Sequence, residues 1–215
     1  NDLINIDIFF DIGAHKGESI NFFLKKIKVK KIISFEASPI NFEFLKKKKN
    51  YYIKKFPNIN IKIENIALGS ENRNISFKQF DESSSSTFSR INKQSKYFKR
   101  KYNLLNFLSK EEIFRSFNLK IQTLDKYMEK NNIKKIDFIK IDTEGYEYEI
   151  LKGLRDKMNN VGIIMIEHHY DDMIKKNYTF RDINALLKVN SFAQIYKSKM
   201  PFRKTFEYIY KKKES

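Results

Sequence analysis

The stretch Phe9-Phe10-Asp11-Ile12-Gly13-Ala14-His15-Lys16-Gly17-Glu18 decides the fold of this chain. An apolar run that ends in a carboxylate and continues through two glycines is typical of a buried parallel strand that leads into a helix through a ligand-binding loop. Glycine at position 13 lets the backbone turn, and glycine at position 17 lets helix and ligand approach closely. The spacing D-x-G-x-x-x-G is not the dinucleotide fingerprint. The acid beside the loop favours a nucleotide-like ligand with cationic or hydroxyl groups.

Short β-rich apolar runs alternate with helical patterns along the rest of the chain, which is typical of βαβ units and a parallel sheet. Ser38 can cap a helix, and Pro39 fits its first position. The expected strands are 7–12, 31–36, 59–66, 73–80, 119–124, 136–141 and 162–166. Two further strands, 192–197 and 205–210, are expected to form an antiparallel hairpin at the sheet edge. The expected helices are 19–26, 40–48, 125–131, a helix that ends at 154, and 179–189.

Length and composition predict a single domain over residues 1–215, with a polar, serine-rich insertion or lid at about 81–117. The chain has no cysteine, which excludes disulfides and cysteine-ligated metals. No apolar stretch approaches the roughly 20 residues of a membrane helix. We therefore expect a soluble, cytoplasmic protein.

The formal net charge of +17 raises the question of a nucleic-acid partner. The charge comes mostly from lysine spread along nearly every predicted helix and turn, and arginine, the better phosphate and base ligand, is sparse. A solvated lysine-rich surface is therefore the favoured interpretation. A non-catalytic nucleic-acid-binding module remains the alternative from a different functional class.

Acidic residues end several predicted strands at the same edge of the sheet, namely Asp11, Glu36, Asp142 and Glu167. Glu36 lies about 25 residues after Asp11, near the distance at which an acid that ends the second strand reaches ribose hydroxyls. A carboxylate can accept two hydrogen bonds in a forked geometry, which suits a vicinal diol. The pattern predicts a ribose-containing cofactor.

The chain resembles the FkbM-type S-adenosylmethionine-dependent methyltransferases in an ordered set of segments between Phe9 and His169. These are FDIGAHKGE, ISFEASP, NIALG, TLDKY, DFIKIDTEGYEYEILKGL and IEHH. The resemblance implies an α/β, Rossmann-like class I methyltransferase fold, with a mostly parallel seven-stranded sheet and an antiparallel last strand. It also implies S-adenosyl-L-methionine as cofactor and methyl transfer to a hydroxyl, on a saccharide, a glycolipid or another small acceptor.

By the same resemblance, the expected cofactor-binding residues are Asp11, Gly13, Ala14, His15, Gly17, Glu36, Asn65, Ala67 and Asp142. The loop would hold the methionine part of the donor, and Glu36 would bind its ribose. Asn65 and Ala67 would flank the adenine, and Asp142 would lie beside the amino group and the substrate entrance. The chain carries Thr143 where the family has D-V-E-G, and its serine run lacks the glycine often present near the lid.

A sulfonium is an excellent leaving group, so transfer needs mainly orientation and removal of a proton. The candidate general bases are Glu144, Glu167, His168 and His169, although Glu144 equally suits a helix N-terminus. Because neighbours on an extended segment point to opposite faces, at most one of the two histidines faces the pocket. Asp142, Glu167 and a histidine could also bind a divalent cation, but we predict no metal.

An RNA methyltransferase is a further alternative, although the N-P-P-[YF] motif is absent.

Overall fold

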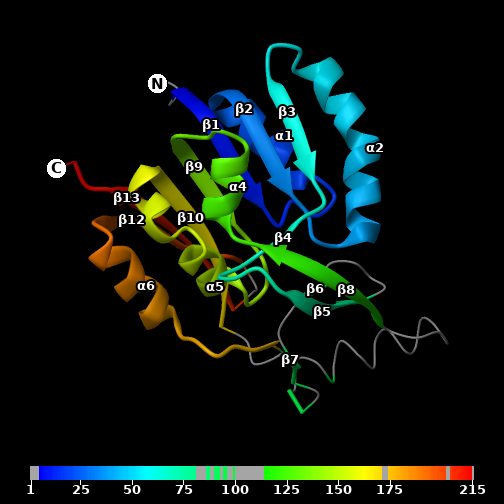
Figure 1. Cartoon of the computed structure of the whole chain (residues 1–215), viewed down its shortest axis with the longest axis vertical. Coiled ribbons are helices and arrows are strands. Elements are labelled where there is room, and N and C mark those ends of the chain that lie inside the picture. The colour runs from blue at the N-terminus through cyan, green and yellow to red at the C-terminus, as the bar shows by residue number, and fades with distance from the viewer. Residues whose placement is uncertain are drawn as a thin grey trace.

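The computed structural model describes residues 5–80, 86–87, 90–92, 94–95, 99, 114–170, 174–201 and 204–214. Its main sheet has seven strands in the order β12-β13-β10-β9-β1-β2-β3 (Figure 1). The strands are β1 (Asn5–Ile12), β2 (Lys28–Phe35), β3 (Asn60–Glu64), β9 (Ile136–Ile141), β10 (Val161–His169), β12 (Phe192–Lys199) and β13 (Thr205–Lys212). The pairs from β10 to β3 are parallel, and β13 runs antiparallel to β10 and β12. The predicted sheet with its antiparallel last strand is confirmed.

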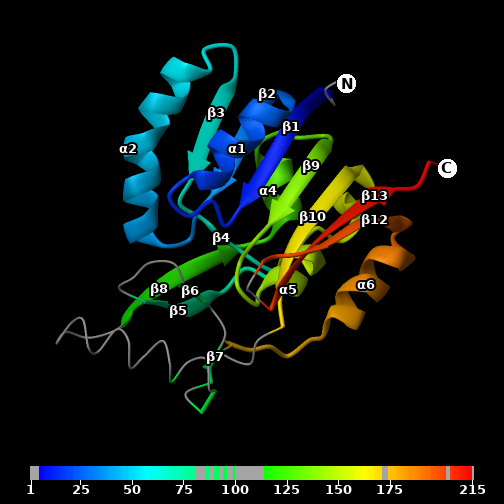
Figure 2. The same cartoon turned by 180° about the vertical axis from the view of Figure 1, so that it is seen from behind.

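Helices cover both faces of this sheet, as the two opposite views show (Figures 1 and 2). They are α1 (Glu18–Lys26), α2 (Pro39–Lys55), α4 (Leu124–Lys130), α5 (Glu147–Lys152) and α6 (Phe180–Val189), with a short 3-10 helix at Arg155–Asn160. Neighbouring residues of β1 point to opposite faces. Phe9 therefore packs with Leu45 of α2 in one core, and Phe10 packs with Tyr127 of α4 in the other.

Local signals explain where the helices begin. The Ser38 hydroxyl accepts a hydrogen bond from the Asn41 N–H at 3.1 Å, and Pro39 occupies the first turn of α2. The predicted end at residue 48 was wrong, because α2 continues to Lys55. Tyr52 is buried on the same side of the helix as Leu45, and the lysines between them are good helix formers in solvent. A capping box between Thr179 and Asp182 begins α6, which confirms the helix predicted at 179–189.

Strand β10 is longer than predicted, since it runs to His169 instead of ending at residue 166. Its last residues pair with the antiparallel strand β13, with Glu167 opposite Glu207 and His169 opposite Thr205. This extension puts Glu167 and His169 on one face of the strand and His168 on the other.

The predicted strand at 59–66 is interrupted. β3 ends at Glu64, and Ala67–Leu68 forms a separate short strand, β4, parallel to β8 (Phe114–Gln122). β8 also pairs with β5 (Asn74–Phe80), and the resulting ribbon projects beyond the main sheet in Figure 1. The remaining short strands are β6 (Ser86–Thr87), β7 (Arg90–Ile91) and β11 (Ile174–Lys175).

Most of the predicted insertion at 81–117 lies outside the described residues, but its last four residues belong to β8. The predicted start of that strand at residue 119 was therefore too late. Among the helices that the structure describes, none combines the length and apolar character needed to cross a membrane.

Candidate functional site

A cavity of about 580 Å³ lies at the carboxyl ends of β1, β2, β9 and β10. This is the edge at which open α/β sheets bind ligands, and the strand order reverses between β1 and β9. Its lining residues are Ile12, Gly13, Ala14, His15, Glu18, Ser19, Phe35, Glu36, Ala37, Asn41, Ile66, Leu68, Lys140, Asp142, Thr143, Glu144, Ile150, Glu167 and His169.

The loop after β1 turns tightly against the neighbouring strands. The N–H groups of Gly13 and Ala14 both donate to the Phe35 carbonyl at 3.0 Å. Gly13 has φ +80°, and a Cβ there would lie 1.8 Å from the Asp142 carbonyl oxygen. Only glycine fits this position, because both the backbone conformation and the close approach exclude a side chain.

Glu36 is held at the cavity wall by the backbone. Its Oε2 accepts the His15 N–H at 2.7 Å, and its Oε1 accepts the Ser38 N–H at 2.8 Å. Only 6% of the residue is exposed, and burial raises the pKa of its carboxyl to about 7. Each carboxylate oxygen has a second lone pair, so Glu36 can accept hydroxyl groups from a ligand in the cavity.

Asp11 lies beneath the cavity and does not line it. It is fully buried, its Oδ2 accepts the Ser19 hydroxyl at 2.7 Å, and the Lys140 Nζ is 3.8 Å from its Oδ1. The same Nζ donates to Asp142 Oδ2 at 3.1 Å. Burial raises the pKa of Asp11. For Lys140, burial alone would lower the pKa, but the nearby carboxylates of Asp11 and Asp142 outweigh it, so the pKa of Lys140 is raised. Asp11 thus orients Ser19 and Lys140, which do line the cavity.

The corner after β3 contributes different residues from those expected. The Asn65 side-chain amide donates to the carbonyls of Glu36 at 2.7 Å and Ala37 at 3.2 Å, so it secures the end of β2. Ala67 faces the core, whereas Ile66 and Leu68 line the cavity. Strand alternation could have indicated these two neighbours.

Gly17 also lies outside the cavity lining. It has φ +86° immediately before α1, and its carbonyl accepts the Tyr52 hydroxyl at 2.7 Å. The second glycine of the loop therefore allows α1 to pack closely against α2.

The two histidines at the end of β10 have different surroundings. His169 lines the cavity, whereas His168 packs beneath it, with its Nδ1 3.7 Å from Glu147 Oε2 and its ring 5.4 Å from that of Phe180. Burial acts to raise the pKa of Glu147, but His168, Tyr178 and Gly145 outweigh it and hold the pKa at about 2. His168 therefore belongs to a buried polar contact between β10 and α5.

Glu144, Glu167 and His169 gather at the end of the cavity away from Glu36, together with Asp142; we call this the acceptor end. Glu144 has φ +46° in the turn after β9. Glu167 is 7% exposed, and burial and Asp142 raise the pKa of its carboxyl to about 8. These groups can accept a proton, or together hold a cation.

The structure thus brings eight predicted site residues to the cavity wall, namely Gly13, Ala14, His15, Glu36, Asp142, Glu144, Glu167 and His169. Asp11, Gly17, Asn65, Ala67 and His168 do not line the cavity. Sequence reasoning missed the apolar lining from Phe35, Ile66, Leu68 and Ile150, and the polar lining from Ser19, Asn41 and Lys140. Most of these depend on which way a side chain faces after the strands pair.

Comparison with known proteins adds independent findings. A family model described as the methyltransferase FkbM domain matches residues 11–196. The curated proteins compared with the chain include no significant match.

Among solved structures, methyltransferase FkbM from Methylobacillus flagellatus KT is 15% identical with a TM-score of 0.62, over 96% of this chain and 43% of its own. TrmK from M. capricolum, solved with S-adenosyl-homocysteine, is 11% identical with a TM-score of 0.53, over 98% of this chain and 64% of its own. The chain spans less than two thirds of the length of either protein. These similarities show the fold.

Proposed function

Because the chain belongs to the FkbM methyltransferase domain family, we propose that it transfers the methyl group of S-adenosylmethionine to a hydroxyl oxygen of a saccharide, a glycolipid or another small acceptor. S-adenosylmethionine is the cofactor to which family membership points. The observation that carries the proposal is the position of Glu36 and the Gly13 turn in the wall of one cavity. The carboxylate of Glu36 can accept hydrogen bonds from hydroxyl groups, and the backbone at Gly13 carries no side chain that would block a ligand. Both lie where the strand order reverses.

The cavity matches the donor in its distribution of polar and apolar groups. In the proposed complex the ribose hydroxyls bind Glu36, and the adenine lies against the apolar side chains of Ile66 and Leu68. The methionine part follows the loop at Gly13, with its amino group near Asp142. This arrangement directs the sulfonium methyl toward the acceptor end.

The reaction then needs an oriented oxygen and a proton acceptor. The acceptor oxygen attacks the methyl carbon, the O–C bond forms as the S–C bond breaks, and S-adenosylhomocysteine leaves. The hydroxyl proton passes to a base at the acceptor end, where Glu144, Glu167 and His169 all line the cavity. Orientation supplies most of the acceleration, and a general base adds about 10²- to 10⁴-fold.

Transfer of label to an acceptor pool tests the proposal. The protein is incubated with methyl-labelled S-adenosylmethionine and cell extract separated into saccharide, lipid, small-molecule, protein and RNA fractions. The expected result is label in a hydroxyl-bearing saccharide, lipid or small molecule, and less label at the same donor concentration with the Glu36→Ala variant. Label confined to RNA or protein would overturn the acceptor class, and failure of the folded protein to bind the donor would overturn the function itself.

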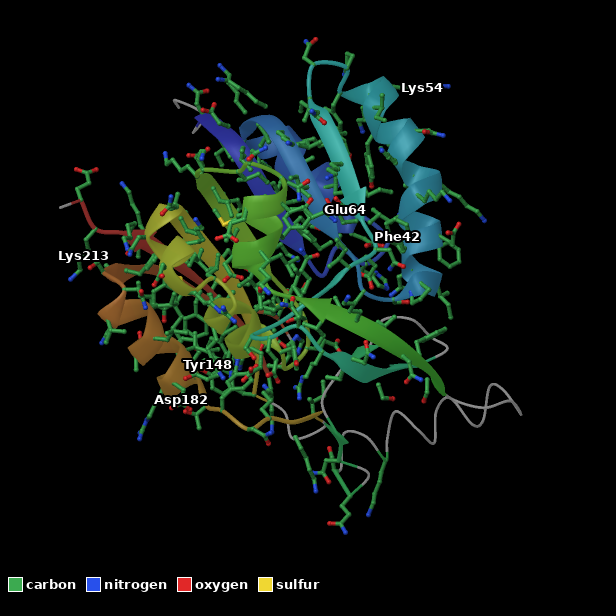
Figure 3. The ribbon with its side chains drawn as sticks, in the orientation of Figure 1. Phe42, Lys54, Glu64, Tyr148, Asp182 and Lys213 are labelled. Carbon is green, nitrogen blue, oxygen red and sulfur yellow. The ribbon has the colours of Figure 1, made fainter. Side chains whose placement is uncertain are left out.

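An RNA methyltransferase is the competing function, and it is favoured only by the net charge of +17. Lysines lie at widely separated places on the surface, as Lys54 of α2 and Lys213 near the C-terminus show in Figure 3. Phosphate contacts produce a steep fall of affinity with salt. Filter binding of RNA over a salt series therefore distinguishes a built nucleic-acid site from a generally basic surface.

A further inference from the structure

Three side chains at the acceptor end form a cluster of potential metal ligands. One ligand atom each from Asp142, Glu167 and His169 lies within 4.8 Å of the other two. Asp142 follows β9, and the other two are alternate residues of β10. Carboxylate oxygens and imidazole nitrogens are common ligands of divalent metals. From this geometry we propose a divalent cation site of the Mn²⁺ type in the cavity wall; that it binds the acceptor hydroxyl rests on the proposed function.

His169 is oriented for this role by a residue outside the cluster. Its Nδ1 is hydrogen-bonded to the Thr205 hydroxyl of β13 at 3.1 Å, and Thr205 is buried. The other ring nitrogen, Nε2, faces Glu167 Oε1 at 3.5 Å. Histidines that bind metals almost always engage their second ring nitrogen in a hydrogen bond, which fixes the ring and directs the first nitrogen to the metal.

The burial of Glu167 is a second observation that points to a bound cation. It is more than nine-tenths buried and lines the cavity. Its carboxylate contacts the other two members of the cluster, Asp142 and His169, and it also interacts with Lys140 and Glu207 at longer range. An ionised carboxylate that is buried beside a second carboxylate is costly unless a proton or a cation compensates it.

The neighbouring lysine supplies only part of that compensation, because two other carboxylates share it. Lys140 is shared between Asp11 and Asp142, at 3.8 Å and 3.1 Å. Glu167 also lies opposite Glu207 in the pairing of β10 with β13. The carboxylates around the acceptor end therefore outnumber the buried cation, and one divalent ion between Asp142 and Glu167 offsets the excess.

The mixed ligand set selects among cations. Mg²⁺ and Ca²⁺ prefer oxygen ligands, whereas imidazole suits first-row transition metals. Three protein ligands leave coordination positions for water or for an oxygen of the acceptor. A hydroxyl bound to a divalent cation loses its proton more readily, so such a site orients the acceptor and eases its deprotonation together.

Electron paramagnetic resonance tests the site without reference to activity. Mn²⁺ is titrated into the full chain, and the loss of the free-ion signal gives the number of sites and their dissociation constant. We expect one site per chain, weakened at least about tenfold by Glu167→Gln or His169→Gln and also weakened by Thr205→Val. Glu18→Gln, the same change in an acid that lines the cavity outside the cluster, should leave binding unaltered.

Equal Mn²⁺ binding in all five proteins, or none in the wild type, would overturn the proposal, provided that circular dichroism shows each variant folded. Calorimetry with S-adenosylmethionine on the same samples separates the two claims. If the wild type binds the donor but not Mn²⁺, only the metal proposal is overturned. If it binds neither the donor nor Mn²⁺, the proposed function is overturned as well.

Discussion

Glu36 shows how backbone hydrogen bonds can hold a side chain in place at a proposed ligand site. Two backbone N–H groups, from His15 and Ser38, hold its carboxylate at the cavity wall. The side chain is therefore oriented before any ligand arrives, so little entropy is lost on binding. Lys140 is its counterpart at the other end of the cavity, where one buried ammonium holds two carboxylates.

Glu36→Ala should weaken binding of S-adenosylmethionine by about 1–3 kcal/mol, because the ribose hydroxyls lose a buried acceptor. Isothermal titration calorimetry measures the change. Glu43→Ala, which removes an exposed carboxylate from α2, is the matched control and should bind the donor as the wild type does. An unchanged dissociation constant in Glu36→Ala would show that the acid has another role.

Lys140→Met should lower the free energy of unfolding by about 3–5 kcal/mol, because it leaves the buried carboxylate of Asp11 without its cation. Denaturant unfolding measures the loss. Adding Asp11→Asn should restore part of the lost stability, because the double variant removes both charges of the Asp11–Lys140 ion pair. If the double variant is less stable than the sum of the single changes predicts, the ion pair is not the source of the effect.

At the scale of elements, pairing between β10 and β13 determines the acceptor end. It extends β10 to His169 and thereby assigns Glu167 and His169 to the cavity face and His168 to the opposite face. On that opposite face, Glu147 at the start of α5 accepts the Gly145 N–H at 2.8 Å and the Tyr178 hydroxyl. This buried carboxylate thus links α5 to the segment before α6.

Glu147 should make stability depend on pH in the acid range. Its pKa is about 2 in the folded chain against an ordinary value of 4.5, so folding favours the ionised form. Its contribution to the free energy of unfolding, about 3 kcal/mol, is therefore present above pH about 4.5 and is lost as the pH falls toward 2. Unfolding measured between pH 3 and 7 should show the advantage of the wild type over Glu147→Gln shrinking as the pH falls. A difference independent of pH would contradict this assignment.

At the scale of the whole molecule, the cavity is assembled from segments far apart in sequence. The loop after β1, the ends of β2, β9 and β10, and the corner at β4 all contribute to its wall. Two separate cores, one on each face of the sheet, hold these segments in position. A ligand that bridges them should therefore stabilise the complete fold.

Saturation with S-adenosylmethionine at 100 times its dissociation constant should raise the free energy of unfolding by about 2.7 kcal/mol. Thermal unfolding followed by differential scanning calorimetry measures this as a higher Tm. Glu36→Ala at the same donor concentration should show a smaller rise. No rise in a folded wild-type sample would mean that the cavity does not hold the donor.

The sequence by itself determined the parallel sheet, the antiparallel last strand, the turn at Gly13 and the acid at Glu36. These depend on local periodicity, glycine spacing and polar strand ends, all of which are encoded within a few neighbouring residues. Only the tertiary structure decided which neighbour faces the cavity. It put Leu68 rather than Ala67 and His169 rather than His168 in the wall, and it buried Asp11 beneath Lys140. The physical reason is that strand register and the point where pairing ends are set by distant partners, and a one-residue change turns every side chain to the opposite face.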